Sequence, residues 1–220
     1  MTFDPHAQPA GLRLPGGAVP AHLEQTVRDR AWSAILMGLG HPDEVADSVY
    51  GVVSEDELPY ERAREAAQFL IAARRRQQES FGEVTTNLDR AFGELNSKRI
   101  IARQNLGCCL NCALDEVHAI AAGDPSWAGF VFFHQQDAER LVESGACELG
   151  FGVFRPYYLT DAQRDAMTSA ELDAFLDERA AELTSTLIIP ILRSHGLGVE
   201  WDGDPDRRIS ISGGQYYSPI

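Results

Sequence analysis

The chain has 220 residues, enough for one large domain or two small ones, and its 44% hydrophobic residues can form a core, which excludes a disordered chain. The formal net charge is −14, and from Asn105 onward acidic residues outnumber arginines by more than two to one. Such a field repels phosphate backbones, so we expect no nucleic-acid binding. It would attract a basic protein partner, unless it serves only as a solvated surface that keeps the protein soluble.

The beginning of the chain carries no recognisable targeting segment. Residues 1–21 lack the basic start and the apolar stretch of a signal peptide, and their prolines and glycines predict a flexible N-terminal arm. No stretch approaches the roughly 20 apolar residues that cross a bilayer, so we expect no membrane association. We therefore expect a cytoplasmic protein, whose four cysteines are reduced thiols, metal ligands or redox-active groups rather than structural disulfides.

Helical periodicity dominates residues 22–97. Apolar residues recur there at three- and four-residue spacing, and interruptions at glycine and proline divide the pattern. The predicted helices cover residues 23–39, 42–49, 60–78 and 88–95, the last with an N-cap at Thr86 or Asn87. We expect one helical region over this part of the chain.

The pattern changes at residue 98, where short β-branched and aromatic runs begin to alternate with amphipathic segments. The predicted strands cover residues 99–103, 129–134 and 149–155, with a hairpin of 198–201 and 208–211. Helices are predicted over 112–122 and 136–144. A longer helix begins at a capping box of Thr168 and Glu171, ends at Gly196 and is kinked at Pro190.

These elements define an α+β domain over residues 98–212, followed by a flexible tail, 213–220. The predicted fold class is α+β: an N-terminal helical segment packed on a C-terminal open mixed β-sheet, with flanking helices and a terminal β-hairpin. The order of the strands does not follow from the sequence.

One dense cysteine cluster lies between a predicted strand and a predicted helix: Cys108, Cys109 and Cys112. A thiol at a helix N-terminus has unpaired N–H groups and the positive end of the helix dipole beside it, and both favour the thiolate. The Cys109-x-x-Cys112 spacing suits half of a tetrahedral zinc site or a dithiol switch, and His134 is a candidate further ligand.

The zinc and the redox interpretations of this cluster each require a sequence feature that is missing. A zinc ribbon needs a second ligand pair, and the remaining candidates, His118, His134 and Cys147, do not recur at ligand spacing. A thioredoxin-like site needs a preceding βαβ context that the pattern does not show. The alternative is that the thiols are small buried apolar groups at a junction between strand and helix.

A second candidate site follows the apolar strand, at His134 and Asp137. A histidine at a strand end with a carboxylate three residues later can act as an oriented catalytic base. Equally, Asp137 can cap the next helix while His134 satisfies a buried hydrogen bond. No Ser-His-Asp nucleophile elbow, glycine-rich phosphate loop or dinucleotide fingerprint is present.

Several motifs together resemble a known bacterial family. They are TTNLDRAF at 85–92, IARQ at 101–104, CCxxC at 108–112 with Glu116 after it, FFHQQD at 132–137 and GLGVEWDGDP at 196–205. The chain is similar in these motifs to an uncharacterised family of unknown function that is frequent in actinobacteria. In that family Gly and His often follow the last cysteine, whereas Ala113 and Leu114 stand here, which removes one metal ligand. The resemblance implies no established activity.

Three functional hypotheses remain open. The first is a non-catalytic binding or regulatory module that engages a basic protein partner through its acidic surface. The second is a zinc-binding or thiol-redox protein that uses Cys108, Cys109, Cys112 and His134, so the cofactor is either none or zinc. The third is an enzyme that uses His134 and Asp137, or one of the cysteines.

Overall fold

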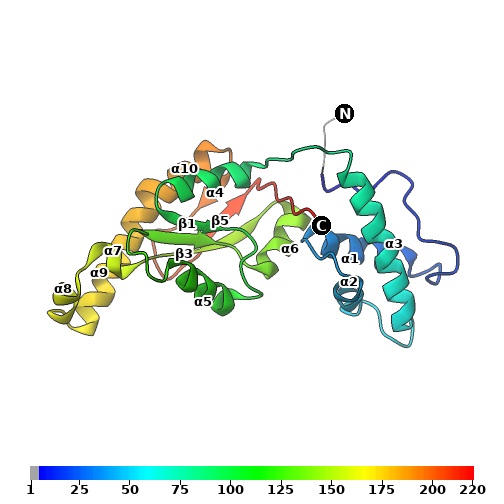
Figure 1. Cartoon of the computed structure of the whole chain (residues 1–220), viewed down its shortest axis with the longest axis horizontal. Coiled ribbons are helices and arrows are strands. Elements are labelled where there is room, and N and C mark those ends of the chain that lie inside the picture. The colour runs from blue at the N-terminus through cyan, green and yellow to red at the C-terminus, as the bar shows by residue number, and fades with distance from the viewer. Residues whose placement is uncertain (1–4) are drawn as a thin grey trace. The chain divides into compact units, whose positions relative to one another are not determined.

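The structure, a computed structural model, describes residues 5–220. The chain forms two compact units. One unit reaches to Val84 and includes Tyr217–Ile220, and the other covers Thr85–Tyr216. Figure 1 shows the elements of both units, which are described separately below.

The first unit contains three helices: α1 (Glu24–Leu36), α2 (Pro42–Val49) and α3 (Tyr60–Gln78). Proline at the first position of α2 costs no hydrogen bond, because the first N–H groups of a helix have no partner within it. The apolar stripe of α3 is buried along its length, as at Ala63, Leu70 and Ile71. The sequence prediction for residues 60–78 is confirmed at both ends of this helix.

A buried arginine organises the described chain ends within this unit. Arg74 is fully buried, and its guanidinium lies 5.8 Å from the ring centroid of Trp32, 5.3 Å from Phe81 and 5.6 Å from Tyr217. Its Nη1 donates to the carbonyl oxygen of Pro5 at 2.6 Å. Cation–π contacts of this kind are strongest when the cation is desolvated. Burial lowers the pKa of Arg74.

The described parts of the arm (1–21) and the tail (213–220), both predicted to be flexible, contain residues that pack or form hydrogen bonds. In the arm, Leu14 and Val19 are buried, whereas residues 1–4 lie outside the described part of the chain. In the tail, the Asn87 side chain of the second unit donates to the Gly213 carbonyl and accepts from the Gln215 N–H, both at 2.8 Å. The prolines and glycines of both segments predicted mobility, and the sequence did not show these contacts.

The second unit holds the remaining elements. Its helices are α4 (Asn87–Ser97), α5 (Leu110–Ala121), α6 (Gln135–Ser144), α7 (Arg155–Tyr158), α8 (Asp161–Asp165), α9 (Ser169–Leu183) and α10 (Ile189–Ser194), with a π-helical segment η1 (Thr184–Ile188). Its strands are β1 (Ile100–Arg103), β2 (Gly129–Phe132), β3 (Cys147–Val153), β4 (Gly198–Glu200) and β5 (Ile209–Ser212). The two short helices α7 and α8 were not predicted.

The strands form one five-stranded sheet in the order β1-β2-β3-β5-β4. β1 and β2 are parallel, and every other neighbouring pair is antiparallel, including the terminal hairpin of β4 and β5. The predicted fold class, α+β with an open mixed sheet, flanking helices and a terminal hairpin, is confirmed.

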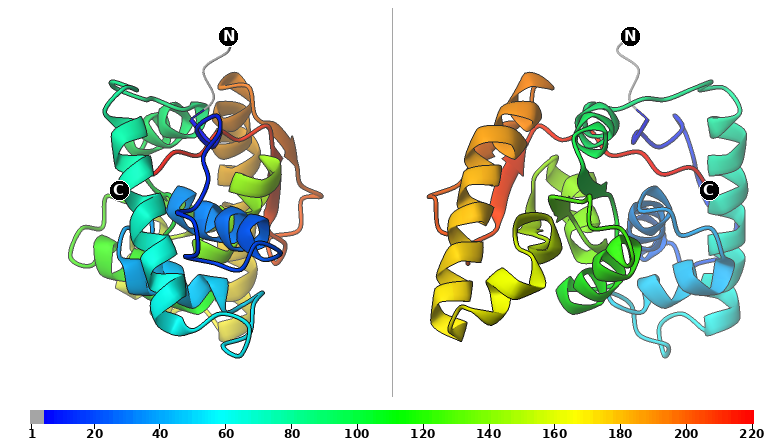
Figure 2. Two further views of the ribbon diagram at one scale, coloured as in Figure 1. Left: turned by 90° about the vertical axis from the view of Figure 1, so that its right-hand side faces the viewer. Right: turned by 60° about the vertical axis from the view of Figure 1, so that its left-hand side comes forward.

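Helices cover both faces of this sheet (Figures 1 and 2). Successive side chains of a strand point to opposite faces. Phe130 and Phe132 of β2 pack with Val117 of α5 on one face. Phe133, just after β2, packs edge-on against Phe92 of α4 on the other, with 6.1 Å between ring centroids. The strong apolar run of β2 reflects this burial on both sides.

Glycines in β3 make room for the β2 aromatic rings. Phe130 pairs with Gly152 and Phe132 with Gly150 across the antiparallel ladder. A Cβ added at Gly152 would lie 2.6 Å from Cζ of Phe130, and one at Gly150 would lie 2.9 Å from Cζ of Phe132. The rings therefore lie directly over backbone that carries no side chain.

The predicted kink at Pro190 takes a specific form. Proline cannot donate a backbone hydrogen bond, and its ring clashes with the preceding turn of an α-helix. The chain widens into η1 immediately before it, and the Ile189 N–H donates to the carbonyl of Thr184, five residues back. A π-bulge of this kind accommodates the proline within one continuous helical segment.

Candidate thiol centre

A glycine shapes the loop that carries the cysteines. Gly107 has a φ of +65°, and a Cβ there would lie 2.7 Å from the backbone nitrogen of Ala113. The loop is anchored at the end of β2, where the Leu106 N–H donates to Phe133 O at 2.9 Å and the Gln135 N–H donates to Gly107 O at 3.1 Å. Gly107 was not among the residues predicted from the sequence, although a glycine directly before a cysteine pair was the available signal.

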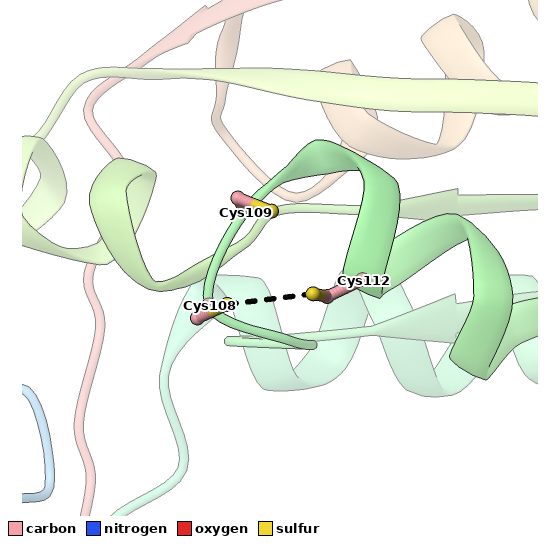
Figure 3. A group of neighbouring side chains, drawn as sticks. All are labelled: Cys108, Cys109 and Cys112. Carbon is pink, nitrogen blue, oxygen red and sulfur yellow. Dashed lines mark hydrogen bonds between the residues drawn. The ribbon is translucent and has the colours of Figure 1, made fainter.

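The three thiols converge on the first turn of α5, as Figure 3 shows. Cys109 is the N-cap residue of α5 and has an extended backbone. The sulfurs of Cys108, Cys109 and Cys112 all lie within 4.8 Å of one another, and those of Cys108 and Cys112 are 3.5 Å apart. Cys108 and Cys112 are exposed and Cys109 is half-buried. This exposure removes the interpretation of the cluster as buried apolar groups.

Hydrogen bonds differentiate the thiols. The pKa of Cys109 is lowered, first because the backbone N–H of Cys112 donates to its sulfur and then because the Cys112 side chain does so. The pKa of Cys112 is raised to about 11, because hydrogen bonds with the Cys108 and Cys109 sulfurs stabilise its protonated form. Cys109 is therefore the more acidic thiol of the pair, and Cys112 holds its proton more tightly.

The cluster lies within a β1–α5–β2 unit, and no βαβ unit precedes it within residues 5–220. β1 and β2 are parallel neighbours, α5 connects them, and the cysteines lie where the chain passes from β1 into α5. A C-x-x-C sequence in such a position is typical of thiol–disulfide exchange sites. The parallel direction of β1 and β2 did not follow from the sequence, because strand direction is a long-range property of the sheet.

His134 is not a member of the thiol group. Among residues 5–220, the cluster of side chains close enough to share a metal ion consists of the three cysteines alone. His134 is instead the N-cap residue of α6 and only 5% exposed. Its Nε2 lies 3.2 Å from Oδ2 of Asp137.

Asp137 is committed to a buried ion pair. Its side chain is 1% exposed. The guanidinium of Arg208, the residue directly before β5, donates to both carboxylate oxygens. It also accepts the backbone N–H of His134 at 3.3 Å. Burial lowers the pKa of His134, which outweighs the opposing effect of Asp137. The geometry favours the interpretation of this pair as a helix cap and an internal support over that of an accessible base.

The other sequence candidates lie apart from the thiols. His118 is near the opposite end of α5, where its ring packs against Phe130 and Phe154 at centroid distances of 5.9 and 5.5 Å. Cys147 is buried in β3, and burial raises the pKa of its thiol to about 12. A thiol in that state is unreactive at neutral pH.

The fold and the site together define a class: an α+β protein with an exposed three-thiol centre at a helix N-terminus. No helix within residues 5–220 combines the length and apolar character needed to cross a bilayer. The chain belongs to the DUF6891 family, described as a domain of unknown function, whose sequence model matches residues 20–216. No curated protein and no solved structure matches the chain significantly. The expectation of an uncharacterised family is thus confirmed.

Proposed function

We propose that this protein is a thiol–disulfide exchange protein in which Cys109 and Cys112 form the exchanging pair. The observation that carries the proposal is the convergence of the sulfurs within 4.8 Å at the N-terminus of α5, in a strand–helix–strand setting. The opposite pKa shifts of the two thiols support it, because exchange requires one thiolate that attacks and one thiol that resolves.

The proposed reaction has two steps. The Cys109 thiolate attacks one sulfur of a partner disulfide, forms a mixed disulfide and releases the partner's other sulfur as a thiolate. Cys112 then loses its proton and attacks the Cys109 sulfur, which releases the second partner thiolate and closes a Cys109–Cys112 disulfide. The protein loses two electrons and the partner disulfide gains them, and the reverse sequence restores the dithiol.

The test is to trap the intermediate. Cys112→Ser removes the resolving thiol, so glutathione disulfide should convert Cys109 of this variant into a stable mixed disulfide that mass spectrometry detects. Cys109→Ser should not form that adduct, and Cys108→Ser should exchange like the native protein. Equal labelling of Cys108 and Cys109 in the Cys112→Ser variant, or no adduct on Cys109, would contradict the proposal.

Metal binding is the second candidate function, and the three-sulfur group favours it. Three thiolates and a water can hold zinc in an open tetrahedral site, whereas a closed structural site needs a fourth protein ligand. The three described ligands fit the open arrangement, with His134 outside it. Elemental analysis of protein purified without chelator tests this function. If the native protein contains stoichiometric zinc and the Cys109→Ser variant does not, metal binding is favoured over thiol–disulfide exchange.

Location and partners follow as parts of the proposal. In the cytoplasm, thiol reductants would keep the pair in its dithiol form. The net charge of −14 supports a partner with a basic surface, whether as exchange substrate or as the target of a regulatory module. A mixed-disulfide complex trapped with Cys112→Ser whose rate of formation falls with added salt would support this. A salt-independent rate would count against a charge-selected partner.

A further inference from the structure

The second unit has a cavity of about 600 Å³ near the C-terminal end of α5. It lies between the turn that follows α5, the end of β3, the beginning of α7 and one side of α9. This volume is within the range of small-molecule sites in proteins. The cavity shares no residue with the thiol centre, whose cysteines are at the other end of the helix.

The walls of the cavity are mainly apolar. Ala122, Val153, Phe154 and Leu176 contribute them, from three different segments of the chain. His118 adds an aromatic ring that is held edge-on against Phe154. Walls of this type favour a ligand with an apolar body.

One cation in the cavity is weakly paired. Arg155 lines it, and its Nη2 is 3.9 Å from a carboxylate oxygen of Asp161, whose side chain is 83% exposed. Exposed pairs at such distances contribute little. The acidic lining residue, Asp124, is already engaged, because it accepts the Ser126 N–H at 2.9 Å. The guanidinium therefore remains available for a ligand.

We propose that this cavity binds a small organic acid, with its apolar body between α5 and α9 and its carboxylate on Arg155. The flat guanidinium presents parallel N–H donors that match a carboxylate in two hydrogen bonds. The carbonyl end of α5 repels negative charge, which places the carboxylate at the α7 side of the cavity. The imidazole of His118 lies against the ligand's apolar body.

The experiment is a binding titration of the full chain with a panel of aromatic and branched carboxylic acids, beginning with 3-phenylpropionate and its neutral twin, 3-phenylpropionamide. Ligand-observed NMR identifies the binders, and calorimetry measures Kd. We expect acids in the panel to bind with a Kd below about 1 mM and the amide to bind at least about tenfold more weakly.

Two variants locate the binding. Arg155→Gln should weaken the acid about tenfold and leave the amide unchanged. Leu176→Trp should fill the cavity and weaken both. Arg164→Gln is the matched control, because the Arg164 side chain is also 33% exposed and also faces Asp161 but does not line the cavity. The proposal is overturned if no acid in the panel binds, or if Arg155→Gln and Arg164→Gln have equal effects.

Discussion

Replacing Asp137 with asparagine tests whether the Asp137–Arg208 pair supports the fold. The variant keeps the shape of the side chain but removes its negative charge. The Asp137 carboxylate is 1% exposed and accepts hydrogen bonds from Arg208 through both oxygens. Breaking a fully buried pair costs about 3–5 kcal/mol, because the remaining charge is left without a partner. Arg208 is 23% exposed and keeps Glu148 at 3.4 Å, so we expect a smaller loss, about 2–3 kcal/mol.

The assay is urea unfolding at pH 7, together with the alkylation rate of Cys109 in the folded protein. Asp161→Asn is the control, because its contact to Arg164 at 3.2 Å lies on the surface and should contribute less than about 1 kcal/mol. Asp137→Asn should lower stability and leave the Cys109 rate unchanged. Unaltered stability with a loss of thiol reactivity would refute the supporting role assigned to Asp137.

Three further predictions concern single residues. Burial lowers the pKa of His134 below the usual 6.5, so the folded state binds fewer protons at this site than the unfolded state. The free energy of unfolding should therefore fall as the pH drops below about 6.5. His134→Asn should make the urea midpoint less dependent on pH between about pH 7 and 5. Gly107→Ala should slow Cys109 alkylation and cost about 1–3 kcal/mol, whereas Gly82→Ala, also at positive φ but with nothing within 4 Å of its Cβ, should leave that rate unchanged. Cys147, buried and with a pKa of about 12, should react with iodoacetamide only after unfolding, while peptide mapping of the native protein should show Cys109 modified first.

Local signals in the sequence were sufficient for most helices and strands. The capping box of Thr168 and Glu171 is present in the structure and starts α9 where expected. The same motif at Thr160 and Gln163 starts α8, and it could have been found by the same reasoning. Such contacts join residues three apart, so the sequence shows them directly.

Long-range contacts could not be predicted in this way. Arg74 is the first of three consecutive arginines near the end of α3, yet it is buried beneath aromatic rings, one of them from Tyr217 near the other end of the chain. Arg208 reaches Asp137 across 71 positions of sequence. Only the folded chain brings these residues together.

The candidate site was predicted in part. The cysteine cluster stood out because its spacing and its place before a helix are local features. The expected involvement of His134 depended on which way its ring would turn, and the ring lies beside Asp137. The Cys109 and Cys112 thiols also differ for a reason the sequence does not show, since it depends on how the first turn of α5 closes.

The most direct measurement is the disulfide content of the native protein after equilibration in a graded series of reduced and oxidised glutathione, with each cysteine mapped by mass spectrometry. We predict one reversible two-electron transition in which Cys109 and Cys112 become linked while Cys108 stays free. A linkage through Cys108 instead, or three thiols that remain reduced across the whole series, would contradict it.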